Sequence, residues 1–108
     1  MTLAELSQKL GLKALTEMHD KEVEGAFVSD MVSDVMAGAK PGSLWVTTQT
    51  HKNVVAAANL VDIAAVVVTS GRAVTDEVVV MANRADLTIL TTDLDTYGLV
   101  VKLHEAGV

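Results

Sequence analysis

The feature that most constrains this sequence is the run Ala64–Val68, in which every residue is a small or β-branched apolar residue. A strand with one face in water alternates apolar and polar side chains, and this run does not alternate. Both of its faces must therefore be covered by other parts of the protein. This is the pattern of a strand in a parallel sheet that carries helices on both sides.

The residues before this run supply a partner strand and a connecting helix. Leu44–Thr48 is rich in β-forming residues, whereas Lys52–Val61 contains no Gly or Pro and holds several Ala residues that favour a helix. Two strands joined by a helix of this length lie parallel to each other. We therefore predict that Ser43–Gly71 forms a strand, a helix and a second strand.

The same unit repeats along the chain. Predicted strands begin near residues 26, 44, 64 and 87, a spacing typical of alternating strands and helices. The remaining helices are predicted at Thr2–Leu10, where Thr2 and Glu5 form a capping box before Gly11, and at Met31–Ala39, Thr75–Ala85 and Thr92–Ala106. The prediction is one α/β domain over residues 1–108, with a mostly parallel sheet of about four strands and helices on both faces.

Composition excludes some classes of function. The 14 acidic and 8 basic residues give a net charge of −6, which opposes binding to nucleic acid in the absence of a basic patch. No apolar run approaches the roughly 20 residues that cross a bilayer, so no membrane partner is expected. The chain has no cysteine and no signal-peptide pattern, which favours the cytoplasm. Because 50% of so small a chain is apolar, we expect a homodimer.

Polar residues follow each predicted strand. Because parallel strands end at one edge of their sheet, these residues are expected to form a rim there, with a candidate site for a small anion or a nucleotide. Residues of these types also cap helices, and capping alone explains Asp30, Thr75 and Thr92. The candidate ligand-binding residues are Ser29, Asp30, Thr48, Gln49, Thr50, His51, Asn53, Ser70, Gly71, Arg72, Thr92 and Asp93.

No pattern in the sequence indicates catalysis, a metal or a cofactor. There is no cysteine nucleophile and no phosphate-binding loop, and the three histidines lie in separate segments without a metal-ligand spacing. Two alternatives stay open. One is a small enzyme that uses His51 with Asp30 or Asp93, and the other is a helix-turn-helix DNA-binding regulator that uses Leu3–Leu12.

Several stretches resemble the DRTGG domain family, which includes the N-terminal domain of HPr kinase/phosphorylase and an insert of some CBS-domain pyrophosphatases. The resemblance extends over nearly the whole chain, but the motif that names the family is altered, because Lys21 replaces Arg and Ala26 replaces the second Gly. The matching stretches are Asp20–Gly25, Val28–Asp30, Ser33–Ala37, Trp45, Gln49–His51 with Asn53, Thr69, and Gly71–Arg72.

This resemblance implies a non-catalytic α/β accessory or regulatory domain that self-associates. Relatives of this kind are often attached to a kinase, an acyltransferase or a phosphatase. In this chain the domain would act by binding a ligand, a second copy of itself or an effector protein. The resemblance implies no particular ligand and no catalytic residue.

Overall fold

Strand β4 (Ala65–Val68) lies inside a five-stranded sheet with the order β1-β5-β4-β3-β2. The computed structural model describes all residues from 1 to 108. The other strands are β1 (Lys13–Ala14), β2 (Gly25–Val28), β3 (Ser43–Thr47) and β5 (Thr88–Thr91). The helices are α1 (Leu3–Leu10), α2 (Val32–Gly38), α3 (Asn53–Val61), α4 (Asp76–Arg84) and α5 (Thr96–Glu105). The predicted α/β class is confirmed.

Strands β2 to β5 are parallel and pair in the order in which they occur in the chain. The sheet has five strands where the sequence predicted about four. The additional strand, β1, pairs antiparallel with β5 through Lys13 opposite Thr91 and Ala14 opposite Leu90. A strand of two exposed residues carries no hydrophobic pattern, and for this reason the sequence did not indicate it.

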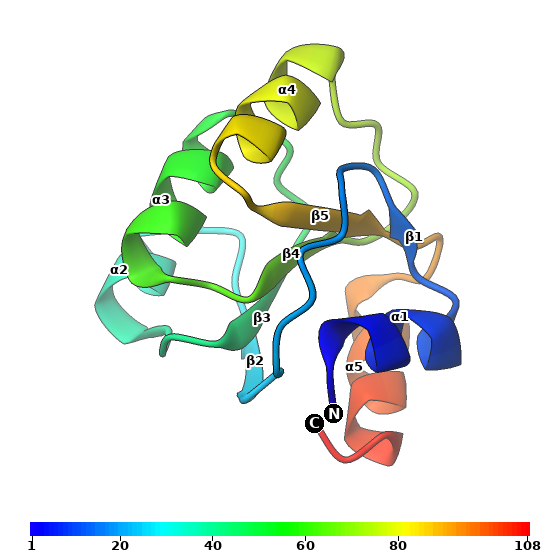
Figure 1. Cartoon of the computed structure of the whole chain (residues 1–108). Helices are drawn as coiled ribbons and strands as arrows, with labels where there is room; N and C mark the ends of the chain where they lie inside the picture. The colour runs from blue at the N-terminus through cyan, green and yellow to red at the C-terminus, as the bar shows by residue number, and fades with distance from the viewer.

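Helices cover both faces of the sheet (Figure 1). On one face, α2, α3 and α4 lie side by side over a core that includes Trp45, Val66 and Ile89. On the other face, α1 and α5 cover a second core that includes Leu44, Val67 and Leu90. Every side chain of β4 is buried, as predicted, because neighbouring residues of this strand contribute to opposite cores.

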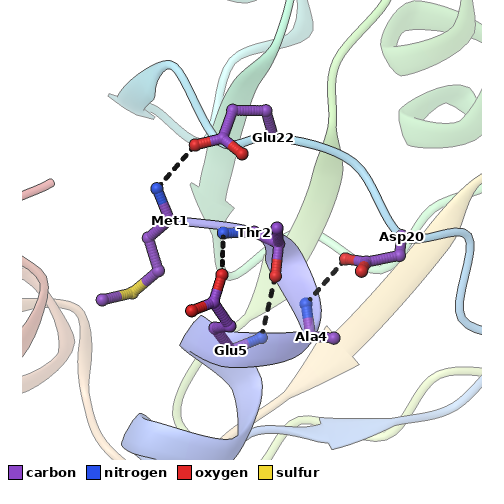
Figure 2. A network of polar contacts seen from close by, with 6 residues as sticks. All are labelled: Met1, Thr2, Ala4, Glu5, Asp20 and Glu22. Carbon is purple, nitrogen blue, oxygen red and sulfur yellow. Dashed lines mark hydrogen bonds and ion pairs between the residues drawn. The ribbon is translucent and has the colours of Figure 1, made fainter.

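The start of the chain is held by polar contacts (Figure 2). The predicted capping box forms: Glu5 N donates to Thr2 Oγ1 at 3.2 Å and Thr2 N donates to Glu5 Oε1 at 3.0 Å. Ala4 N donates to Asp20 Oδ1, and the amino group of Met1 forms an ion pair with Glu22 at 2.6 Å. These contacts tie α1 to the polar segment that leads into β2.

Two helices begin later than predicted. Helix α2 begins at Val32 without a side-chain cap, and Asp30 binds a neighbouring loop instead. Helix α5 begins at Thr96 with Asp95 as its cap, whereas Thr92 Oγ1 accepts a hydrogen bond from Leu94 N. The chain needs residues 92–95 to cross from the end of β5 to the opposite face of the sheet. Thr75 caps α4 as predicted.

The helix-turn-helix alternative is wrong. Helix α1 is followed by strand β1 and not by a second helix. Leu3 and Leu6, which belong to the segment proposed for DNA binding, are fully buried against the sheet. The helices are also short, since the longest has 10 residues, and none combines the length and hydrophobicity that crossing a membrane requires.

Val67→Asp tests the position of β4. Val67 has no exposed surface, so the substitution buries an unpaired carboxylate in the middle of the sheet. We expect a loss of more than about 4 kcal/mol in the free energy of unfolding, measured by urea denaturation with circular dichroism. Val101→Asp on α5 is the control, because Val101 is 39% exposed and should tolerate the charge. A Val67→Asp protein of native stability would contradict this placement.

Candidate functional site

The carboxyl ends of β2, β3, β4 and β5 lie at one edge of the sheet, because these strands are parallel and adjacent. All of the candidate site residues follow one of these strands in the chain. Their environments differ, however. Two groups of them hold neighbouring loops together, and a third group lines an open groove.

The first group joins the end of β2 to the loop after β3. Asp30 Oδ1 accepts hydrogen bonds from Thr48 N at 2.7 Å and from Thr47 Oγ1 at 3.0 Å. The indole N–H of the fully buried Trp45 donates to the carbonyl oxygen of Ser29 at 2.8 Å. Ser29, the Asp30 carboxylate and the backbone N–H of Thr48 therefore bind other parts of the protein.

The electrostatic environment of Asp30 stabilises its ionised form. The hydrogen bond from the Thr48 backbone is the main cause that holds the pKa of the Asp30 carboxyl below its usual value. The Thr47 hydroxyl and the positive charge of Arg72 lower the pKa further, whereas partial burial opposes them. The charge of Arg72 makes the smallest of these contributions to the Asp30 pKa.

The second group joins the loop after β4 to the loop after β5. Ser70 N donates to the carbonyl oxygen of Leu94 at 2.7 Å, and Gly71 N donates to that of Thr92 at 2.9 Å. Ser70 and Gly71 both have a left-handed backbone, with φ of 65° and 63°. A Cβ atom on Gly71 would lie 3.0 Å from Asp93 Oδ1, so glycine suits both the backbone and the narrow space.

The connection between the loops after β4 and β5 occupies the place where a ligand usually binds in such sheets. The chain leaves β4 towards α4 on one face and leaves β5 towards α5 on the other, and such a change of face commonly opens a crevice. Here the backbone hydrogen bonds between the two loops close it. Ser70, Gly71 and Thr92 thus form a hydrogen-bonded connection between the loops, and Asp93 lies beside Gly71.

The third group lines a groove between the loop after β3 and the start of α4. Its volume is about 560 Å³. It contains three of the candidate residues and four that the sequence analysis did not select. The lining residues are Gln49, Thr50, His51, Lys52, Thr75, Glu77 and Val78.

The residues from α4 could not be placed at this groove from local patterns. They lie beside the β3 loop because β3 and β4 are neighbours and their following helices lie on the same face. Lys52 was within reach of sequence reasoning, since it belongs to the same polar run as His51. Asn53 lies elsewhere: it lines a second groove, between α2 and α3.

The loop that forms one wall of this groove has free backbone donors. Thr50 N, His51 N and Lys52 N have no acceptor within the protein. The next backbone N–H, that of Asn53, donates to His51 Nδ1 at 3.2 Å. His51 therefore supports the start of α3, where Lys52 at the cap position provides no side-chain hydrogen bond.

The contacts of His51 do not form the pair that a small enzyme would need. Its Nδ1 atom accepts a hydrogen bond from the protein backbone, and neither Asp30 nor Asp93 forms a hydrogen bond with it. The carboxylate of Asp30 is bound to Thr47 and Thr48. No carboxylate in this arrangement orients His51 as a general base.

Asp30→Asn should lower stability in a pH-dependent manner. Because the folded protein lowers the Asp30 pKa, the ionised carboxylate stabilises the fold above the unfolded pKa of about 3.9 and loses this effect as the pH falls through the folded value. After allowance for its solvent exposure, we expect a loss of about 1 kcal/mol at pH 7.

Urea midpoints of both proteins, measured from pH 7 downwards, check this expectation. The difference in stability should shrink once the pH is below about 4. Asp86→Asn is the control, since the Asp86 carboxylate is exposed and accepts no hydrogen bond within the protein. A difference for Asp30→Asn that stays constant over this pH range would contradict a role for the ionised form.

Comparison with solved structures shows a similar fold in a larger protein. The chain is similar to the CBS and DRTGG domains of the regulatory region of Clostridium perfringens pyrophosphatase, solved with the activator diadenosine tetraphosphate, at a TM-score of 0.70 and 16% sequence identity. The similarity covers 89% of this chain and 43% of that chain. This chain thus corresponds to less than half of its structural relative. Among curated proteins, none matches the sequence.

The sequence also matches a family model. The model of the DRTGG domain matches residues 5–106, which include every strand and the groove after β3. The resemblance stated from the sequence is therefore confirmed. The protein belongs to the DRTGG domain family.

Proposed function

We propose that this chain is a non-catalytic regulatory domain that self-associates and binds a small anionic ligand, such as the phosphate groups of a nucleotide, in the groove after β3. Membership of the DRTGG family supports a regulatory role. The structural relative from Clostridium perfringens is itself part of a regulatory region and was solved with a nucleotide activator.

The observation that carries the ligand proposal is the set of three consecutive free backbone N–H groups at Thr50, His51 and Lys52. Successive backbone donors in a loop before a helix form a concave site that favours anions. The Lys52 ammonium adds positive charge beside them, because Lys52 lines the same groove. In the neighbouring loops, the Asp30 carboxylate and the backbone N–H groups of Ser70 and Gly71 already bind within the protein.

The lining of the groove indicates which part of a ligand it suits. Of its seven lining residues only Val78 is apolar, so the groove offers little surface on which a nucleotide base could stack. Phosphate oxygens match the backbone donors better. Glu77 lies on the α4 side of the groove, so an anion would bind towards the loop, away from this carboxylate.

A binding experiment tests this proposal. Nucleotides, including diadenosine tetraphosphate, and inorganic phosphate are screened by thermal shift, and each hit is titrated by isothermal calorimetry. We expect His51→Ala and Lys52→Ala, at two residues that line the groove, to weaken the binding of a phosphate-containing hit by about tenfold each, which corresponds to about 1.4 kcal/mol.

His104→Ala is the control for this experiment. His104 is exposed on α5, on the face of the sheet opposite to the groove, and its loss should leave the affinity unchanged. If all three variants bind a hit equally well, the ligand binds elsewhere. If no phosphate compound binds at millimolar concentration, the anion proposal is wrong.

A further inference from the structure

The outer surface of α2, α3 and α4 carries exposed apolar side chains. Leu60 on α3 is 71% exposed, Met36 on α2 is 51% exposed and Val80 on α4 is 46% exposed. These three helices form one layer over the sheet (Figure 1). Helix α5 also exposes Tyr97, Val100 and Val101, but the hollows with a mainly apolar lining lie between α2, α3 and α4, as is typical of an interaction surface.

Two apolar hollows flank α3 on this surface. The hollow between α2 and α3 has a volume of about 210 Å³ and includes Val32, Met36 and Asn53 in its lining. The hollow between α3 and α4 has a volume of about 330 Å³ and includes Val55, Met81 and Arg84. Both are lined in addition by Ala56, whose small side chain lets another helix approach α3 closely.

The three helices share a direction. Each one connects neighbouring parallel strands, so all three run the same way and begin at the same edge of the sheet. The fifth residue is Met36 in α2, Ala57 in α3 and Val80 in α4. A twofold axis along a line that crosses the outer surface near these positions would turn each helix antiparallel to its own copy.

The charges on this surface are complementary about that line. On α3, Lys52 lies five residues before Ala57 and Asp62 lies five residues after it. On α4, Glu77 and Arg84 lie on either side of Val80, near opposite ends of the helix. All four side chains are exposed. A twofold rotation about this line would place Lys52 opposite Asp62 and Glu77 opposite Arg84 of a second copy.

We infer that the layer formed by α2, α3 and α4 is the surface through which two copies of this chain dimerise, with their α3 helices antiparallel across the exposed Ala56. This inference rests on the self-association part of the proposed function and specifies its surface. The rotation brings Leu60 of the partner subunit beside Asn53, at the hollow between α2 and α3. Antiparallel helices also align the positive end of one helix with the negative end of the other.

The layer is of a suitable size for a stable dimer. A standard interface buries about 800 Å² on each partner, which is about one seventh of the 5710 Å² surface of this chain. The molecule measures 32 × 27 × 23 Å, so a layer of three helices provides a face of this order. The exposed Leu60, Met36 and Val80 side chains would lie at its centre, where burial contributes most to affinity.

Leu60→Asp tests this surface in sedimentation velocity and light scattering over a range of concentrations. The wild-type chain should form a particle of twice its 11.4 kDa mass. The substitution should raise the dissociation constant by about 30-fold or more, because it places a charge at the centre of the interface. Leu60 is 71% exposed, so the folded monomer should be retained, as circular dichroism would show.

Tyr97→Asp is the matched control, since Tyr97 is 78% exposed on α5 and lies on the opposite face of the sheet. It should leave the dissociation constant unchanged. Glu77→Arg and Arg84→Glu should each weaken the dimer by about tenfold, and the double variant should recover most of this loss. In a single chain the double variant places a positive charge at the start of α4 and a negative charge at its end, and both oppose the helix dipole. A recovery of the dimer affinity would therefore show that the two charges interact with those of a partner subunit.

Two other outcomes would overturn the inference in distinguishable ways. A dimer that is equally strong in Leu60→Asp would show that another surface, such as the free edge of β2, makes the contact, and self-association would stand. A wild-type chain that stays monomeric at millimolar concentration would overturn both this inference and the proposed self-association. The proposed anion site would still be tested by its own titrations.

Discussion

Burial of β4 on both faces is the constraint on which the rest of the structure depends. Its neighbouring side chains enter two separate cores, so the sheet cannot leave either face in water. Helices must then connect the strands, and the strands must run parallel. The parallel direction in turn places every loop that follows β2, β3, β4 and β5 at one edge. The polar rim is therefore a geometric consequence of an apolar strand.

The rim shows how hydrogen bonding separates structural residues from candidate binding residues. Asp30 binds the loop after β3, and Ser70 and Gly71 bind the loop after β5, so these residues hold the edge of the sheet in place. Between these two hydrogen-bonded connections, the backbone N–H groups of residues 50–52 have no acceptor within the protein. The proposed anion site therefore rests on a loop with free donors between two hydrogen-bonded connections.

Features that depend on local patterns could be predicted from the sequence. Ala64–Val68 indicated a buried strand, and Thr2 with Glu5 indicated a helix start, because burial and capping act over a few residues. Features that depend on residues distant in the sequence could not be predicted in this way. Asp30 was expected as a helix cap, but its partner comes from the next strand. Strand β1 has only two residues, and Thr75 and Glu77 reach the groove through the order of the strands.

The order of strands β2 to β5 has a consequence for how the chain folds. Each of these strands pairs with its successor, across sequence separations of 18, 21 and 23 residues, from Gly25–Ser43 to Ala65–Thr88. The pairing of β1 with β5 joins Lys13 to Thr91, a separation of 78 residues. Closing this loop costs about 1.3 kcal/mol more in chain entropy than closing the 18-residue loop between β2 and β3. The parallel strands can thus pair progressively along the chain, whereas the pairing of β1 with β5 requires the closure of a much longer loop.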